Sequence, residues 1–176
     1  MSKKVIILTF ELESLPYQAF SEIKRIHSKK ELTVEQMAVV YHSGTGDHQF
    51  EMKDFLDFTG KNHTAKNSTI GMFLGILGGP LGMMFGWFAG SVLGGAQDAK
   101  ELSQAASIFE FIGKELPEGQ TGLLLLADEK DNRPLNQLVF NQLGGQITRF
   151  DVEDVEGEIA KAQTLEAEVE EKKTKP

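Results

Sequence analysis

The chain has 176 residues, a formal net charge of −8 at pH 7, a pI of about 5.0 and no cysteine. That length is enough for one domain with a substantial core. The acidic balance argues against a nucleic-acid partner, since phosphates are bound by clustered Lys and Arg. The lack of cysteine excludes disulfides, thiolate catalysis and Cys-ligated metals, and is typical of a cytosolic or cytosol-facing protein.

The first half of the chain has the pattern of a β-α-β unit followed by a hairpin. The β-branched run at residues 5–10 is typical of a buried strand, and charged residues follow it where a signal peptide would have its cleavage site. A helix is expected from Ser14, its candidate cap, to residue 27. A second strand is expected over 34–42, and alternation over 50–53 predicts its return strand.

An expected linker over residues 54–68 leads into an uncharged glycine-rich segment. Residues 71–95 contain nine glycines and one proline. Glycines recur at every fourth position in two series, so on a helix each series would form a bare stripe along which another helix can approach closely. The predicted helix-packing and oligomerisation residues are Gly71, Gly75, Gly78, Gly82, Gly86, Gly90 and Gly94.

Gly79 and Pro80 are the expected turn of a helical hairpin, because proline removes an amide donor and clashes with the preceding helical turn. The two arms would cover about residues 69–78 and 81–96. At 1.5 Å per residue they measure about 15 Å and 24 Å, less than the ~30 Å hydrocarbon core of a bilayer.

The remaining positions of the segment carry large apolar side chains. Those expected to contact lipid or another apolar surface are Phe73, Leu77, Met84, Phe85, Trp87 and Phe88. Membrane contact is the favoured interpretation, and a hairpin buried in protein is the alternative, since apolar stretches of this length are often core helices. Against the membrane, Trp87 lies in the middle of an arm and few basic residues flank the segment.

A second β-α-β unit is expected after the segment. Asp98 and Glu101 have the spacing of a capping box and predict a helix that ends at Pro117. Residues 122–126 form a second continuous apolar run, which predicts another buried strand.

The unit closes with a helix and a strand, and a charged tail follows. Asp131 or Asn132 is expected to cap the helix, which Gly144 would end, and residues 146–151 are expected to form the last strand. Residues 153–176 are charged and alanine-rich, and predict a solvated helix that frays at its end.

The two units, at residues 4–42 and 121–151, predict an α+β fold in which they interleave as a ferredoxin-like antiparallel sheet with an extra hairpin strand. The first strand of each unit would lie in the interior of the sheet. Such strands need cover on both faces. Helices would cover one face, and a second subunit or the glycine-rich insert the other. If both units share one sheet, both ends of the insert must lie on the same side of the membrane.

The order of these elements, with the glycine-rich insert followed by FIGKELPEGQTGLLLLADEKD at residues 111–131, resembles a bacterial family. It is the family named domain of unknown function 1269, whose members are often labelled predicted membrane proteins. The resemblance covers about residues 3–152. It implies a ferredoxin-like domain with a membrane-directed or self-associating insert, and it supplies no catalytic residues.

Other motifs are weak candidates for chemistry. His42 and His48, with Asp47, could form a weak metal site across the hairpin, but solvated imidazoles are the simpler interpretation. Residues 59–64 lack the spacing of a phosphate-binding loop, and the glycines at 43–46 are explained by a tight turn.

No acid/base pair stands out. Glu11 and Glu13 follow a strand and have no partner base in the pattern. A small enzyme of the dimeric ferredoxin-like type would need a polar residue in its sheet cleft, for which Thr9 and Tyr41 are the mild candidates. We expect no enzymatic activity, cofactor or metal.

The sequence therefore predicts a self-assembling, membrane-associated protein with a cytoplasmic domain, whose partners are its own copies and membrane lipid. The alternative is a cytoplasmic, soluble homo-oligomeric ligand-binding or regulatory module with the hairpin buried in the assembly. The expected divisions are 1–67 and 98–152 for the halves of the domain, 68–97 for the insert and 153–176 for the tail.

Overall fold

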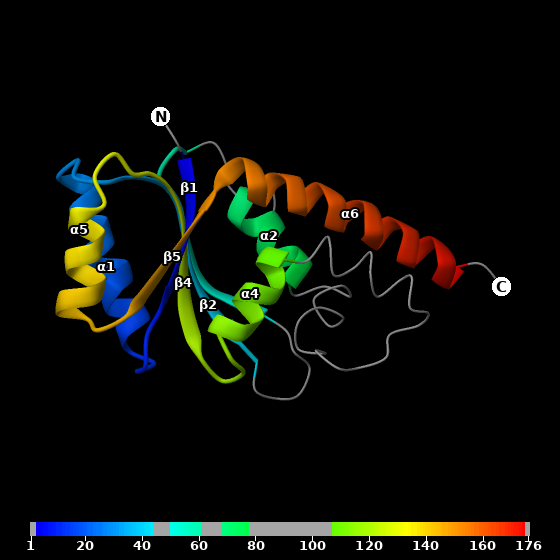
Figure 1. Cartoon of the computed structure of the whole chain (residues 1–176), viewed down its shortest axis with the longest axis horizontal. Helices are drawn as coiled ribbons and strands as arrows, with labels where there is room; N and C mark the ends of the chain where they lie inside the picture. Colours follow the sequence, from blue (N-terminus) through cyan, green and yellow to red (C-terminus); the bar gives the residue numbers. More distant parts are fainter. Residues whose placement is uncertain (1–2, 44–49, 61–67, 78–106, 175–176) are drawn as a thin grey trace.

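The computed structural model describes residues 3–43, 50–60, 68–77 and 107–174, in which helices lie on both faces of one sheet (Figure 1). In chain order the elements are β1 (Lys3–Thr9), α1 (Leu15–Ser28), β2 (Thr33–His42), β3 (Phe50–Asp57), α2 (Thr69–Leu77), α4 (Ser107–Glu115), β4 (Thr121–Asp128), α5 (Arg133–Asn136), the π-helical turn η2 (Gln137–Gln142), β5 (Gln146–Asp151) and α6 (Val152–Thr174).

The five strands form one antiparallel sheet in the order β3-β2-β4-β1-β5. The two continuous apolar runs, in β1 and β4, are interior neighbours, as predicted from their lack of a polar face. Ile6 pairs with Leu125, and Leu8 pairs with Leu123. Side chains alternate along each strand, so the two strands supply a core on both faces of the sheet.

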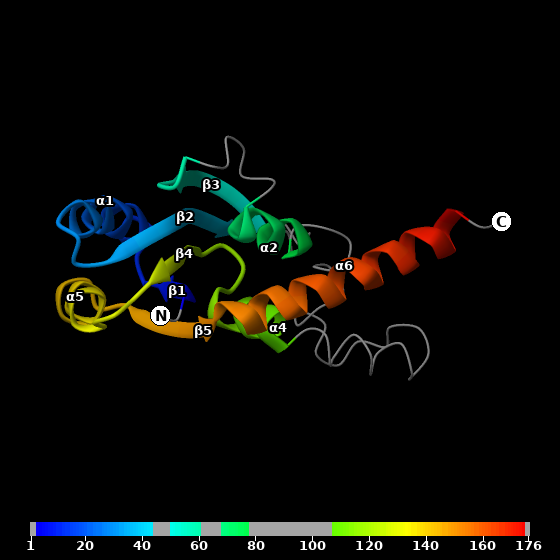
Figure 2. The same ribbon diagram turned by 90° about the horizontal axis from the view of Figure 1, so that it is seen from above.

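The first face is covered by α1, α5 and η2, which lie side by side (Figures 1 and 2). Apolar residues of α1 recur at helical spacing, and Phe20, Ile23 and Ile26 are buried against the sheet. The loop after η2 passes very close to the end of β1, so that a Cβ at Gly145 would lie 2.7 Å from the carbonyl oxygen of Thr9 and 2.5 Å from Cδ1 of Phe10.

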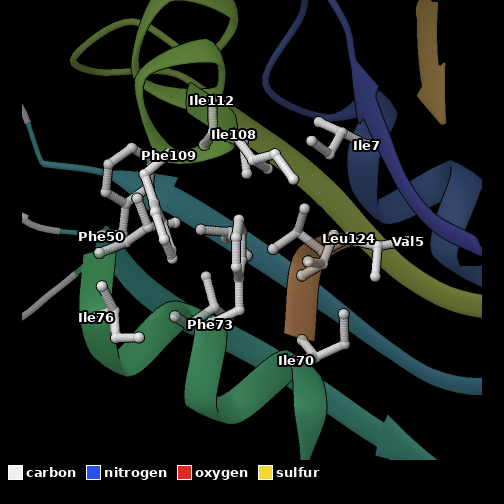
Figure 3. Close-up of a cluster of buried hydrophobic side chains, with 14 of the residues drawn as sticks. Val5, Ile7, Phe50, Ile70, Phe73, Ile76, Ile108, Phe109, Ile112 and Leu124 are labelled. Carbon is white, nitrogen blue, oxygen red and sulfur yellow. The ribbon is translucent and has the colours of Figure 1, made fainter. Parts of the chain in front are cut away.

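The second face is covered by α2, α4 and the first part of α6 (Figure 1). Their apolar residues form one cluster with Val5, Ile7 and Leu124 of the sheet, in which Phe73 stacks on Phe109 (Figure 3). Of the two expected covers for this face, the chain uses the first helix of its insert. The other expected cover, a second subunit, is not the one that packs on this face in the described structure.

Strand β3 runs four residues beyond the alternating pattern that predicted it. In its pairing with β2, Val39 lies opposite Asp54 and Val40 opposite Met52, so Lys53 is an extra residue that forms a bulge. A bulge interrupts the alternation of polar and apolar residues. Residues 54–57, predicted as part of a linker, therefore continue the strand, with the alternation shifted by one residue.

The helix ends follow the predictions only in part. Pro16 lies in the first turn of α1, but Ser14 makes no side-chain capping bond. At α5 it is Asp131, one of the two predicted caps, whose carboxylate accepts the N–H of Arg133. At the end of α1, Lys30 takes a left-handed conformation with φ of 62°, and the following N–H reaches Ile26 O as in a Schellman motif.

The expected C-terminal helix is confirmed, but its description as solvated is wrong for its first three turns. Val155, Ile159 and Ala162 are buried in the cluster of the second face. Their spacing of four and three residues places them on one face of α6. The sequence pattern hides this stripe because charged residues surround it on the other positions.

Candidate functional site at the base of the glycine-rich segment

Helix α2 is the described part of the glycine-rich insert, and two side chains fix where it begins. The Ser68 hydroxyl accepts the N–H of Gly71 at 2.8 Å. Gln36, a buried residue of β2, accepts the N–H of Ile70 through Oε1 at 3.2 Å. The first amides of a helix have no partner within the helix. A cap from the sheet therefore attaches the start of the insert to the domain.

The structure places four of the predicted site residues on α2. Phe73 and Leu77 have no exposed surface and lie in the chain's own core, so their apolar contact is with protein. Gly75 is exposed, and a Cβ there would meet nothing within 4 Å; Gly71 is half-buried. The other predicted residues, which are Gly78, Gly79, Pro80, Gly82, Met84, Phe85, Gly86, Trp87, Phe88, Gly90 and Gly94, lie outside the described residues.

Both ends of the undescribed stretch 78–106 lie against α6. On the outgoing side, Gln163 Nε2 is 3.9 Å from the sulfur of Met72 in α2. On the returning side, the carboxylate of Glu158 accepts the N–H of Ile108 at the start of α4 at 2.9 Å. Figures 1 and 2 show α2 and α4 together under α6. We call this layer, formed by α2, α4 and residues 152–162 of α6, the insert base.

The far end of α4 is fastened to β2 by His42. The His42 ring stacks on Phe50 with centroids 4.2 Å apart, and Nδ1 lies 2.6 Å from the carbonyl oxygen of Leu116, to which it donates. The backbone of His42 also exchanges hydrogen bonds with Gly119 and Gln120 of the turn into β4. This buried histidine holds the turn between α4 and β4. Its proposed metal partners Asp47 and His48 lie outside the described residues.

A hollow of about 450 Å³ lies beside α6. Ile108 and Phe150 form its apolar part, and Gly157 leaves the helix backbone open at its side. Its remaining lining residues are charged, namely Glu153, Asp154, Glu158 and Lys161. No three His, Asp or Glu side chains in the part of the chain that is described are placed so that together they could hold a metal ion. The hollow is therefore an acidic surface feature that suits a basic group.

Those of the other weak candidates that the structure describes are not assembled into a reaction centre. Glu11 and Glu13 are exposed. Thr59 donates its hydroxyl and its N–H to Asp57, which makes residues 57–60 a local turn after β3. Tyr41 lies under the ammonium group of Lys53, 5.2 Å from the ring centroid.

Sequence reasoning missed the residues that position the insert, namely Gln36, Met72, Glu158 and Gln163. Only Gln36 carried a signal, since it is a polar residue within a strand that is otherwise largely apolar. No helix of the described ranges combines the length and the apolar character needed to cross a bilayer. Comparison of the chain with protein-family models, curated proteins and solved structures yields no match. Function is therefore inferred from the chain's own residues.

Proposed function

We propose that this chain is a non-enzymatic, self-assembling protein that associates with a membrane through its glycine-rich segment, carried by a ferredoxin-like domain. The domain would serve as a platform, and its partners would be other copies of the chain and membrane lipid. The resemblance to the domain of unknown function 1269 family is consistent with this proposal.

The observation that carries the proposal is the position of the two ends of stretch 78–106. The helices at these ends are in direct contact, since Phe73 of α2 stacks on Phe109 of α4 with ring centroids 4.8 Å apart. A single membrane crossing would separate its two ends by about 30 Å. If the segment enters a membrane, it must therefore return to the side of the membrane on which the domain lies.

Length limits what the segment can do before it returns. Two transmembrane helices need about 40 residues, whereas the stretch 78–106 has 29 residues, of which 78–97 are uncharged. The nine residues of α2 are already used to cover the sheet. We therefore favour shallow insertion into one leaflet, or packing of the glycine stripes between copies, over a hairpin that crosses the bilayer twice.

The ferredoxin-like assignment is supported by the strand order. Without the extra hairpin strand β3, the order is β2-β4-β1-β5, with α1 joining β1 to β2 and with α5 and η2 joining β4 to β5. This order agrees with the one expected for two interleaved split β-α-β units, and it is the support for the proposed fold class. The insert then lies between the two units, as the resemblance implies.

A second candidate is a homo-oligomer that works without lipid, with the segment buried between copies. It is favoured by the burial of Phe73 and Leu77, because the insert begins as part of a protein core and not as a lipid-facing helix. The two candidates share self-association through the glycines and differ in whether lipid is needed.

Membrane fractionation followed by sizing tests both candidates. The leading proposal expects the chain in the membrane pellet and released only by detergent, and the second expects it in the supernatant. Gly86→Leu should reduce the oligomer size in detergent, since a leucine blocks close helix approach. Met84→Leu is the matched control in the same segment. An oligomer size that Gly86→Leu leaves unchanged would contradict both candidates.

A further inference from the structure

Met72 makes a polar contact between the insert and α6. It lies in the first turns of α2 and is half-buried, packed against the cluster of the second face. Its sulfur faces the side-chain amide of Gln163, an exposed residue of α6, with 3.9 Å between the sulfur and Nε2. A thioether is a weak hydrogen-bond acceptor, so this contact contributes little to stability as it stands.

The surroundings of Met72 on α2 leave its sulfur open to a small reagent. Gly75, one helical turn further on, is exposed, and a Cβ there would meet nothing within 4 Å. Residues three apart are neighbours on a helix surface, so α2 places no side chain beside Met72 at that position. Gln163 lies on another side of the sulfur, but its side chain is exposed and has room to move away. Met37 differs, because it has no exposed surface.

We propose that Met72 is a site of reversible oxidation to methionine sulfoxide, and that Gln163 holds the oxidised side chain. With hydrogen peroxide as the oxidant, a lone pair of the sulfur attacks one peroxide oxygen. The S–O bond forms as the O–O bond breaks, and the proton of the attacked oxygen passes to the departing hydroxide, which leaves as water. The sulfur loses two electrons and the peroxide gains them. Methionine sulfoxide reductases reverse this oxidation.

The sulfoxide suits the position of Gln163 better than the thioether does. An oxygen added on the side of the sulfur that faces α6 would lie between the sulfur and Nε2, which are 3.9 Å apart. An N–H···O hydrogen bond needs about 2.9 Å between its donor and acceptor atoms, so a small movement of the exposed amide gives an ordinary bond. The polar oxygen then points toward the exposed amide and away from the apolar cluster. Oxidation therefore strengthens the attachment of α2 to α6.

This oxidation would make the insert base respond to oxidants. Helix α6 already holds α4 through Glu158, which accepts the N–H of Ile108. With Met72 oxidised, α6 also holds α2 through a stronger acceptor, so both ends of stretch 78–106 are fastened to the same helix. The inference does not depend on the proposed function. Its tests measure oxidation and unfolding, whereas the proposed function is tested by fractionation and oligomer size.

Timed treatment of the folded full chain with hydrogen peroxide tests the site. Tandem mass spectrometry of its peptides measures the oxidation rate of each methionine. We expect Met72 to be oxidised about tenfold faster than Met37 in the folded chain, and at the same rate in urea, because oxidation follows exposure. Equal rates in the folded chain would overturn the site. Protection of Met72 by residues 78–106 or by another copy would give that result and would equally refute it.

A cycle of variants tests the role of Gln163. Met72→Leu removes the reactive sulfur, and Gln163→Leu removes the amide donor. Circular dichroism gives the change in melting temperature on oxidation for the parent chain, both single variants and the double variant, which separates the contribution of Met72 from that of the other methionines. With Gln163 present, oxidation of Met72 should raise the melting temperature by about 2–4 °C, the effect of one added hydrogen bond in a chain of this length.

The gain should be absent in Gln163→Leu and kept in Gln142→Leu, the matched control at an exposed glutamine of η2. If oxidation of Met72 lowers the melting temperature, or raises it equally without Gln163, the role of Gln163 is overturned. Treatment of the oxidised parent chain with two methionine sulfoxide reductases, one for each sulfoxide epimer, should restore the starting melting temperature. Failure to restore it would refute a reversible site.

Discussion

Replacing Phe73 with alanine distinguishes a core helix from a lipid-facing helix at the start of the insert. Phe73 has no exposed surface, and its ring stacks on that of Phe109 at an angle of 20°. Truncation of a buried phenylalanine costs about 3–5 kcal/mol. In a chain of this length each kcal/mol lowers the melting temperature by about 2–4 °C. We therefore expect Phe73→Ala to lower the melting temperature by roughly 6–20 °C.

The control for this prediction is Met72→Ala, on the half-buried side of the same helix, where the expected cost is about 1 kcal/mol. Thermal and urea unfolding followed by far-ultraviolet circular dichroism measure both variants. If Phe73→Ala costs no more than Met72→Ala, and instead reduces the fraction bound to lipid vesicles, the placement of α2 in the core is refuted.

Three further predictions concern the domain that carries the insert. Lys30→Gly should stabilise the fold by about 0.5–1 kcal/mol in urea unfolding, because its φ of 62° suits glycine better than lysine; a loss of stability would contradict this. Gly145→Ala should cost about 1–3 kcal/mol or more, because the new Cβ would lie 2.5 Å from the ring of Phe10, and a neutral effect in the same assay would show that the loop after η2 is not packed so closely. Arg133 holds the pKa of Asp131 at about 2, so Arg133→Gln should raise that pKa toward ~4 in a carboxyl NMR titration. A carboxylate with a lowered pKa stabilises the fold at pH values above its unfolded pKa. The small contribution of this exposed pair should therefore be lost as pH falls from about 4 toward 2, and the loss should be smaller in the variant, which keeps only the backbone N–H bond to Asp131.

Patterns that extend over a whole strand were sufficient to place much of the sheet. The runs at residues 5–10 and 122–126 are apolar on both faces, which is the property of interior strands, and both are interior. The last strand is bounded by Gly145 and the charged tail, and its predicted range 146–151 agrees with β5. The position of each of these strands in the sheet followed from the two β-α-β units, because few strand orders allow short connections between consecutive elements.

The pattern failed where one residue changed the phase or where the partner was distant. The bulge at Lys53 could not be seen from the alternation that it interrupts, so the end of β3 was missed. In α6, the buried stripe is outnumbered by glutamates and lysines, which makes a half-buried helix resemble a solvated one. The second face of the sheet is covered through contacts between α2 and elements up to 91 residues away in the sequence. A pattern of neighbouring residues carries no information about contacts at such a separation.

The candidate site was predictable in outline and not in detail. The regular spacing of the glycines was enough to single out the insert, and the need for cover on both sheet faces suggested one place where it could lie. Which residues hold it was not predictable, because Gln36 and Glu158 act on amides far away in the sequence. A glutamate in a charged helix carries no local sign that it caps another helix.

The direct junction of β5 with α6 has a mechanical consequence. The strand ends at Asp151 and the helix begins at Val152, so no loop separates them to absorb a bend. Lys4 pairs with Asp151 at the junction, and Arg149 holds the carboxylate of Glu129. The outermost strand β5, which only β1 retains in the sheet, is therefore coupled to the first turns of α6, whose Val155, Ile159 and Ala162 pack on the second face. Separation of β5 from β1 should draw these three side chains out of the cluster, so that the sheet edge and this part of the core open together.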